Sequence, residues 1–238
     1  MAKHTTLITG ASTGIGRATA EMLAQQDHFV IGLARREVHD FPGEYIQIDL
    51  MDERAAQDVL NDITARYAID GLVNNVGIVR PAPLEEITLK DLRDVYEVNV
   101  RVAVQCMQAA APSMKQKKYG RVVNIASLVT SGVPHRGVYA SAKCGLVSFT
   151  RTWALELAKY GITVNAVSPG PTATEMFNRN NPVGSDGYKR YTGMTAMKRV
   201  APPEEIAVAI CFFMGQNASF VTGQHLYVDG GASVGRSD

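Results

Sequence analysis

The sequence predicts an α/β protein built on a doubly wound parallel sheet of about seven strands. Short apolar runs alternate with helical patterns along nearly the whole chain, as expected of a parallel sheet covered by helices on both faces. The chain has 238 residues, enough for one well-buried domain spanning 1–238. A glycine-rich turn separates the first strand from the first helix, which is where this class of fold binds phosphate groups.

Seven runs are predicted to be strands and five stretches to be helices. The predicted strands are 6–9, 29–34, 45–48, 69–73, 122–126, 162–167 and 224–228. The predicted helices are 51–67, 88–118, 139–160, 202–213 and one that follows Gly16. Residues 175–199 are rich in Asn, Gly, Lys and Arg. We expect them to form a long loop, of the kind that is usually a substrate lid or a disordered segment.

Composition and charge exclude several classes of function. Charged residues make up 20% of the chain and the net charge is +1, so nothing indicates a nucleic-acid or membrane surface. No apolar run is long enough to span a membrane, and the first residues do not resemble a secretory signal. Cys106, Cys144 and Cys211 are widely spaced, which favours reduced thiols over disulfides or a metal site. We therefore expect a cytoplasmic protein without a metal.

The turn after the first strand has the sequence Gly10-Ala-Ser-Thr-Gly14-Ile-Gly16. Glycines let the backbone turn tightly and approach a phosphate, and the following helix supplies free N–H groups and the positive end of its dipole. The spacing differs from the commoner Gly-x-Gly-x-x-Gly. Its position between a strand and a helix still predicts a dinucleotide site.

Two arginines, Arg35 and Arg36, directly follow the second strand. In dinucleotide-binding folds an acidic residue near this point binds the ribose 2′-hydroxyl, whereas an arginine accommodates a 2′-phosphate. The alternative is a solvated pair of arginines at a strand end. We favour phosphate contact because guanidinium matches phosphate oxygens by geometry, and we favour Arg35 because alternate residues of a strand face opposite ways.

A tyrosine, a lysine and a serine form the predicted catalytic group. Tyr139 and Lys143 are four residues apart, so on a helix they share one face. A cation beside the phenol is expected to lower the tyrosine pKa, so that it can exchange a proton during hydride transfer at a carbonyl. Ser127 ends the run 122–126, and open α/β sheets place ligands at strand ends.

Two asparagines leave alternatives open. Asn75 follows the fourth strand, where its amide could equally tie neighbouring backbones together or hold a ligand. Asn99 lies in the middle of helix 88–118 among several valines, where a polar amide must find partners or cost stability. From the residues alone, Asn99 could be a satisfied core amide.

Taken together, the motifs of residues 5–231 resemble those of short-chain dehydrogenase/reductases, in the same order. They are Thr9-Gly10-x-x-x-Gly14-Ile15-Gly16, Asn74-Asn75-Val76-Gly77, Ser127, Tyr139-x-x-x-Lys143, Pro169-Gly170-x-Thr172-x-Thr174 and Tyr227-Val228-Asp229-Gly230-Gly231. The chain is similar to the simple single-domain branch that includes 3-oxoacyl-carrier-protein reductases. Val76 replaces the usual alanine, and Thr13 stands where NADP-using members often carry a basic residue.

The resemblance implies a Rossmann-type sheet, a nicotinamide cofactor and a homotetramer. It implies that Tyr139 is the general acid, that Lys143 lowers its pKa and binds the nicotinamide ribose, and that Ser127 orients the substrate oxygen. Asn99 would hold a water in a proton relay to Lys143. Together with Arg35 and Arg36, which are predicted from their position after the second strand, the implied cofactor contacts make up the following set. They are Gly10, Ser12, Thr13, Gly14, Ile15, Gly16, Arg35, Arg36, Asp49, Leu50, Asn75, Val76, Gly77, Tyr139, Lys143, Pro169, Gly170, Thr172 and Thr174.

The leading hypothesis is an NADP(H)-dependent oxidoreductase that acts on a small-molecule carbonyl or secondary alcohol. An NAD-dependent alcohol dehydrogenase of the same family is the second hypothesis. A non-catalytic nucleotide-binding regulatory protein is the third. The presence of Asn99, Ser127, Tyr139 and Lys143 argues against it, because a protein without catalytic activity has no need to keep all four. The glycine spacing and the lack of a large C-terminal domain disfavour a sugar-nucleotide epimerase.

Overall fold

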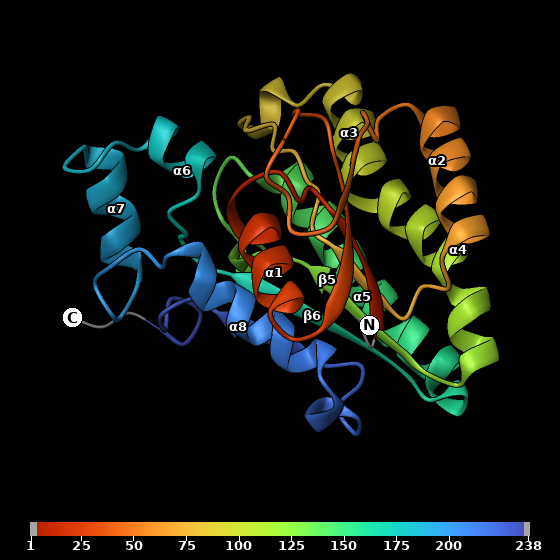
Figure 1. Cartoon of the computed structure of the whole chain (residues 1–238). Helices are drawn as coiled ribbons and strands as arrows, with labels where there is room; N and C mark the ends of the chain where they lie inside the picture. The colour runs from red at the N-terminus through yellow and green to blue at the C-terminus, as the bar shows by residue number, and fades with distance from the viewer. Residues whose placement is uncertain (1–3, 236–238) are drawn as a thin grey trace.

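The computed structural model (Figure 1) describes residues 4–235. It contains a seven-stranded sheet in the order β3-β2-β1-β4-β5-β6-β7. The strands are β1 (His4–Thr9), β2 (His28–Ala34), β3 (Glu44–Gln47), β4 (Gly71–Asn74), β5 (Gly120–Ile125), β6 (Ile162–Pro169) and β7 (His225–Val228). All neighbouring strands pair in parallel. The predicted doubly wound sheet is confirmed. Its strand order reverses between β1 and β4, where such sheets form a ligand crevice.

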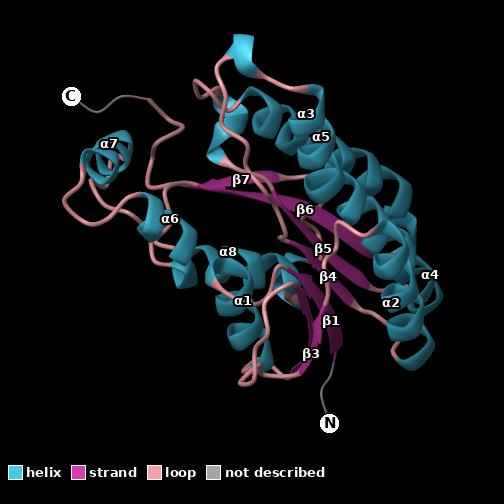
Figure 2. Cartoon of the chain, turned by 90° about the horizontal axis from the view of Figure 1, so that it is seen from above, coloured by secondary structure: helices cyan, strands magenta, loops and turns pink. Residues whose placement is uncertain are grey.

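Helices cover both faces of the sheet (Figure 2). On one face lie α1 (Gly14–Ala24) and α8 (Pro203–Met214), and on the other lie α2 (Glu53–Arg66), α3 (Leu89–Tyr96), α4 (Val102–Lys117) and α5 (Gly137–Leu157). Each face has its own hydrophobic core. Leu7 belongs to one core and its neighbour Ile8 to the other, because successive strand side chains point to opposite faces.

The predicted helix 88–118 is present but is not uniform. Thr88 caps α3 by accepting a 3.0 Å hydrogen bond from the Asp91 N–H. A five-residue π-helix, η2 (Glu97–Arg101), then connects α3 to α4. Single π-helical turns inside α-helices are rare and are frequent at functional sites, and Asn99 lies in this one.

The prediction that residues 175–199 form a loop is wrong. The segment contains two short helices, α6 (Glu175–Asn180) and α7 (Asp186–Met194), which stand apart from the sheet (Figures 1 and 2). Thr174 and Ser185 cap them by accepting hydrogen bonds of 3.2 and 3.1 Å. Phe177 of α6 packs edge-on against Tyr191 of α7, with ring centroids 5.2 Å apart. Side-chain caps and this aromatic contact therefore order a segment that its composition marks as irregular.

A search of residues 4–235 for a helix both long enough and apolar enough to cross a membrane finds none.

Candidate active site

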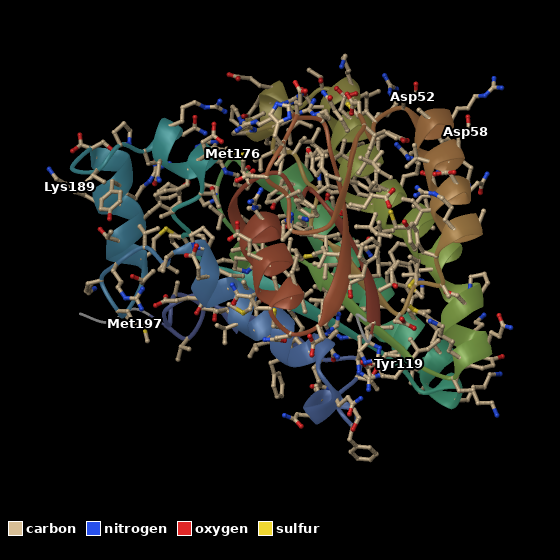
Figure 3. All side chains as sticks on the ribbon, in the orientation of Figure 1. Asp52, Asp58, Tyr119, Met176, Lys189 and Met197 are labelled. Carbon is tan, nitrogen blue, oxygen red and sulfur yellow. The ribbon has the colours of Figure 1, made fainter. Side chains whose placement is uncertain are left out.

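A cleft of about 320 Å³ opens where β1, β2 and β4 end. It therefore lies at the point where the strand order reverses. The predicted cofactor residues that line it are Gly10, Ser12, Thr13, Gly14, Ile15, Arg35, Arg36, Asp49, Leu50, Asn75, Val76, Gly77 and Thr174. It also has an apolar lining that sequence reasoning missed, although two of these residues, Ala34 and Ile48, end predicted strands. The apolar residues are Ala34, Ile48, Met51, Ile78, Val98 and Met176. Figure 3 labels Met176, a residue of α6 on the side of that helix nearer the sheet.

The glycine-rich turn forms the floor of this cleft. A side chain at Gly10, which has a φ of +68°, would place its Cβ 2.8 Å from Asn75 Nδ2. A Cβ at Gly16 would lie 2.3 Å from the Gly10 carbonyl oxygen. Asn75 Nδ2 donates 3.0 Å hydrogen bonds to the carbonyls of Thr9 and Gly10. Asn75 thus ties the end of β4 to the turn and also lines the cleft, so both of its predicted roles are compatible with the structure.

The N-terminus of α1 suits an anion. Its N-cap residue, Thr13, makes no side-chain cap hydrogen bond, and its first turn contains no acidic residue. The leading N–H groups of a helix need partners from outside the helix, and a phosphate supplies them. The turn and this helix end therefore fit the pyrophosphate of a dinucleotide.

Arg35 and Arg36 stand on the rim of the cleft. Arg35 Nη1 is 3.9 Å from Asp49 Oδ2, whereas Arg36 forms a two-point ion pair with Glu175. Two side chains of β3 hold the backbone of the two arginines in place. Gln47 Nε2 donates a 3.0 Å hydrogen bond to the Arg35 carbonyl, and the Tyr45 hydroxyl donates one to the Arg36 carbonyl. The arginines are therefore positioned by their neighbours.

Tyr139, Lys143 and Ser127 come together as predicted. Tyr139 and Lys143 lie in the first turns of α5, and Lys143 Nζ is 5.6 Å from the centroid of the Tyr139 ring. The side chain of Ser127 lies near enough to the Tyr139 hydroxyl to act on its pKa. Ser127 follows β5 and caps the short helix η3 (Leu128–Ser131).

The predicted lowering of the tyrosine pKa is wrong for the protein alone. Burial of the Tyr139 hydroxyl raises its pKa from 10.0 to about 12, although the side chain of Ser127 opposes this. Burial likewise lowers the pKa of Lys143 from 10.5 to about 7. Lys143 Nζ donates a 2.7 Å hydrogen bond to the Ile125 carbonyl. The cost of burying each charge therefore outweighs the attraction that the sequence suggested.

Asn99 has satisfied donors and an unsatisfied acceptor. Its Nδ2 donates 2.9 Å hydrogen bonds to the carbonyls of Ile78 and Val95. Its buried Oδ1 has no hydrogen-bond partner among the described residues. A Cβ built on Gly77 would lie 2.6 Å from this Oδ1 and 3.4 Å from Lys143 Nζ. The two polar atoms therefore face one narrow space beside the cleft, which fits a bound water or cofactor hydroxyl.

Six predicted cofactor residues do not line the cleft: Gly16, Tyr139, Lys143, Pro169, Gly170 and Thr172. A Cβ at Gly170 would lie 2.6 Å from the Cα of Asp229, and Thr172 Oγ1 donates to the Gly170 carbonyl at 2.9 Å. Gly170 and Thr172 thus shape the turn that brings Thr174 to the cleft. Lys143 adjoins the cleft at Gly77, where a Cβ would lie 3.4 Å from its Nζ, and Tyr139 lies beside Lys143.

A parallel sheet with this turn, this cleft and a neighbouring Ser-Tyr-Lys group defines a dinucleotide-dependent oxidoreductase. A family model described as enoyl-(acyl carrier protein) reductase matches residues 10–233. The 3-oxoacyl-acyl-carrier-protein reductase FabG of Escherichia coli K12 is 35% identical over 235 residues, which cover 94% of this chain and 95% of FabG.

Solved structures agree with this result. A protein described as belonging to the short chain dehydrogenase/reductase family is 34% identical, with a TM-score of 0.87 and 98% of each chain covered. A protein of Beutenbergia cavernae, described as an NAD(P)-dependent gluconate 5-dehydrogenase with bound NADP at low occupancy, is 32% identical. Its TM-score is 0.90, and the match covers 99% of this chain and 98% of that one. The chain belongs to the short-chain dehydrogenase/reductase family of NAD(P)-dependent oxidoreductases.

Proposed function

We propose that this protein transfers hydride between NADP(H) and a carbonyl or secondary alcohol of a small molecule, with Tyr139 as general acid and base. The observation that carries the proposal is that Tyr139, Ser127 and the buried Lys143 come together, with Lys143 Nζ 5.6 Å from the centroid of the Tyr139 ring. FabG, a ketone reductase by name, and the NADP-bound neighbour support it. The 3-oxoacyl thioesters implied by the FabG name are the first substrate class to assay.

The residues of the cleft fit the cofactor. The glycine turn and the start of α1 would hold the pyrophosphate, Asp49 and Leu50 would contact the adenine, and Arg35 would contact the 2′-phosphate. Thr174 would contact the nicotinamide carboxamide, and Lys143 the ribose beside it. When bound, NADPH supplies the hydride.

The high pKa of Tyr139 suits reduction. At neutral pH its hydroxyl stays protonated and can donate to the substrate oxygen as negative charge develops there. The Ser127 hydroxyl can hydrogen-bond the same oxygen and orient it. Lys143, with a pKa of about 7, is partly protonated at neutral pH and can return a proton to the tyrosine. A water held by Asn99 Oδ1 would link Lys143 to solvent.

An NAD-dependent dehydrogenase is the second candidate. Arg35 and Arg36 each face a carboxylate, from Asp49 and Glu175 respectively. Those carboxylates weaken the positive field that a 2′-phosphate would meet. This observation favours a smaller preference for NADP(H) than two unpaired arginines would give.

The test is the ratio of kcat/KM for NADPH to that for NADH in the wild type and in Arg35→Asp. The wild type should favour NADPH, since a charge-assisted hydrogen bond contributes ~1.5–3 kcal/mol, or roughly ten- to a hundredfold in affinity. Arg35→Asp should erase or reverse the preference. Arg93→Asp, at an exposed arginine of α3 outside the cleft, is the matched control. A wild type that prefers NADH, or a ratio that Arg35→Asp leaves unchanged, would contradict the proposal.

We further infer a homotetramer in the cytoplasm. Three large apolar side chains on α5, α8 and β7 are solvent-exposed in the single chain, namely Leu155, Phe212 and Leu226, and burying each of them between subunits would stabilise an assembly. The three free cysteines support a reducing compartment.

A further inference from the structure

A two-point ion pair joins the rim of the cleft to α6. Arg36 Nη1 is 2.5 Å from Glu175 Oε2, and Arg36 Nη2 is 3.2 Å from Glu175 Oε1. The two residues are 139 positions apart in the chain. Glu175 is the first residue of α6, and its neighbours Thr174 and Met176 both line the cleft. The pair therefore links the adenosine end of the cleft to the segment that begins the predicted lid.

This contact uses the part of Arg36 that best recognises a phosphate. A guanidinium binds carboxylate and phosphate through the same pair of parallel N–H groups, and here both terminal nitrogens point at Glu175. The hydrogen bonds of the pair lower the pKa of Glu175 and raise the pKa of Arg36, so both groups stay charged. Arg35 is less engaged, since its contact with Asp49 is a single one of 3.9 Å.

We propose that Glu175 is a cofactor-specificity determinant, whose carboxylate competes with the cofactor 2′-phosphate for Arg36. The proposal rests on the proposed use of NADP(H). A cofactor with a 2′-phosphate displaces Glu175 and detaches the start of α6 from the rim. A cofactor with a free 2′-hydroxyl leaves the ion pair in place.

Two effects act in the same direction. The phosphate takes the N–H groups that Glu175 occupies, and the phosphate and the carboxylate repel each other. The phosphate can replace the Glu175 carboxylate at low cost, because the Arg36–Glu175 pair is weak. The two side chains are 54% and 52% exposed, and exposed ion pairs contribute little. Glu175 therefore reduces the preference for NADP(H) without abolishing it, and the position of α6 depends on which cofactor is bound.

The experiment measures binding of two cofactor fragments by calorimetry, adenosine 2′,5′-bisphosphate and adenosine 5′-monophosphate. Glu175→Gln should bind the bisphosphate about two- to fivefold more tightly than the wild type, the factor expected for an exposed pair. Its affinity for the monophosphate should not change. In an Arg36→Gln background the same substitution should give a smaller gain, because the shared partner is missing and only the charge repulsion is relieved.

A matched control is available in the same chain. Arg199 and Glu205 form another exposed two-point pair, with both distances 2.8 Å, and neither residue lines the cleft. Glu205→Gln should leave both affinities unchanged. In the wild type, hydrogen exchange of α6 amides should become faster with the bisphosphate but not with the monophosphate.

Three results would overturn the proposal: no gain for the bisphosphate in Glu175→Gln, an equal gain for both fragments, or an equal gain in the Arg36→Gln background. Failure of the proposed NADP(H) use gives a different result. In that case the wild type binds the bisphosphate no more tightly than the monophosphate, and Arg35→Asp does not change the ratio of the two affinities. A gain for the bisphosphate in Glu175→Gln that needs Arg36 would still support competition at Arg36.

Discussion

Lys143 should make the stability of this protein depend on pH in an unusual direction. Its side chain is 1% exposed, and burial lowers its pKa from 10.5 to about 7. Each pKa unit corresponds to about 1.4 kcal/mol, so keeping this lysine protonated costs the folded state up to about 5 kcal/mol. Lys143→Met removes the charge while retaining a side chain of similar length.

The sign follows from proton binding in the two states. Below pH 7 both states carry the proton, and the folded state bears the full cost. Between pH 7 and pH 10.5 the unfolded chain binds more protons than the folded one, so the free energy of unfolding rises with pH. Above pH 10 the raised pKa of Tyr139 acts in the opposite direction, because the folded state then retains a proton that the unfolded state loses.

The assay is urea unfolding at a fixed protein concentration, since subunit association would otherwise shift the result. From about pH 7 to about pH 9.5 the wild type should gain roughly 3 kcal/mol relative to Lys143→Met. Lys189→Met is the control, because Lys189 lies on the outer side of α7 and is 71% exposed (Figure 3). Parallel pH profiles for the wild type and Lys143→Met would refute the argument that burial sets this pKa.

Three further predictions concern catalysis, closure and assembly. Tyr139→Phe should lower kcat by at least roughly 10²- to 10⁴-fold, the usual contribution of a general acid, with cofactor binding by calorimetry nearly unchanged; a tenth of wild-type activity would identify another acid. The 2′-phosphate alone should loosen the start of α6, but cofactor and substrate together should give residues 175–199 a net gain in hydrogen-exchange protection, since closure would exclude water; equal protection with and without both ligands would count against a lid. Light scattering should show a tetramer at micromolar concentration, and a monomer there would disprove the inferred assembly.

The strands could be predicted because the signal for a buried parallel strand is local. The run at 162–167 consists largely of β-branched and apolar residues, and β6 begins at Ile162 and is buried over almost its whole length. The short link after β2 also holds no helix, and its Phe41 fills the space where a side chain at Gly32 would lie, since a Cβ there would be 2.5 Å from the Phe41 ring. A local sequence pattern therefore predicts a strand wherever its packing requires only apolar side chains.

The ion pairs of the rim could not be predicted, because they join residues far apart in the chain. Nothing local to Arg36 indicates that Glu175 would lie 2.5 Å away, since their contact depends on where the turn 169–174 leads. The pKa values of Tyr139 and Lys143 could not be predicted either, because they depend on surroundings contributed by distant parts of the chain. Their four-residue spacing brings them together, but the surrounding burial decides which protonation state each prefers.

Asn99 shows how a local pattern can identify a residue without its function. Its apolar neighbours indicated a buried helix face, and the amide is indeed 1% exposed. Its Nδ2 binds the carbonyl of Val95, four residues earlier, and also that of Ile78 outside the helix. The first contact uses a carbonyl that an α-helix would normally pair with a backbone N–H, and the chain is π-helical over these residues. The same arrangement turns Oδ1 towards Gly77 and Lys143, so the change in helix geometry and the unpaired acceptor occur together at this one side chain.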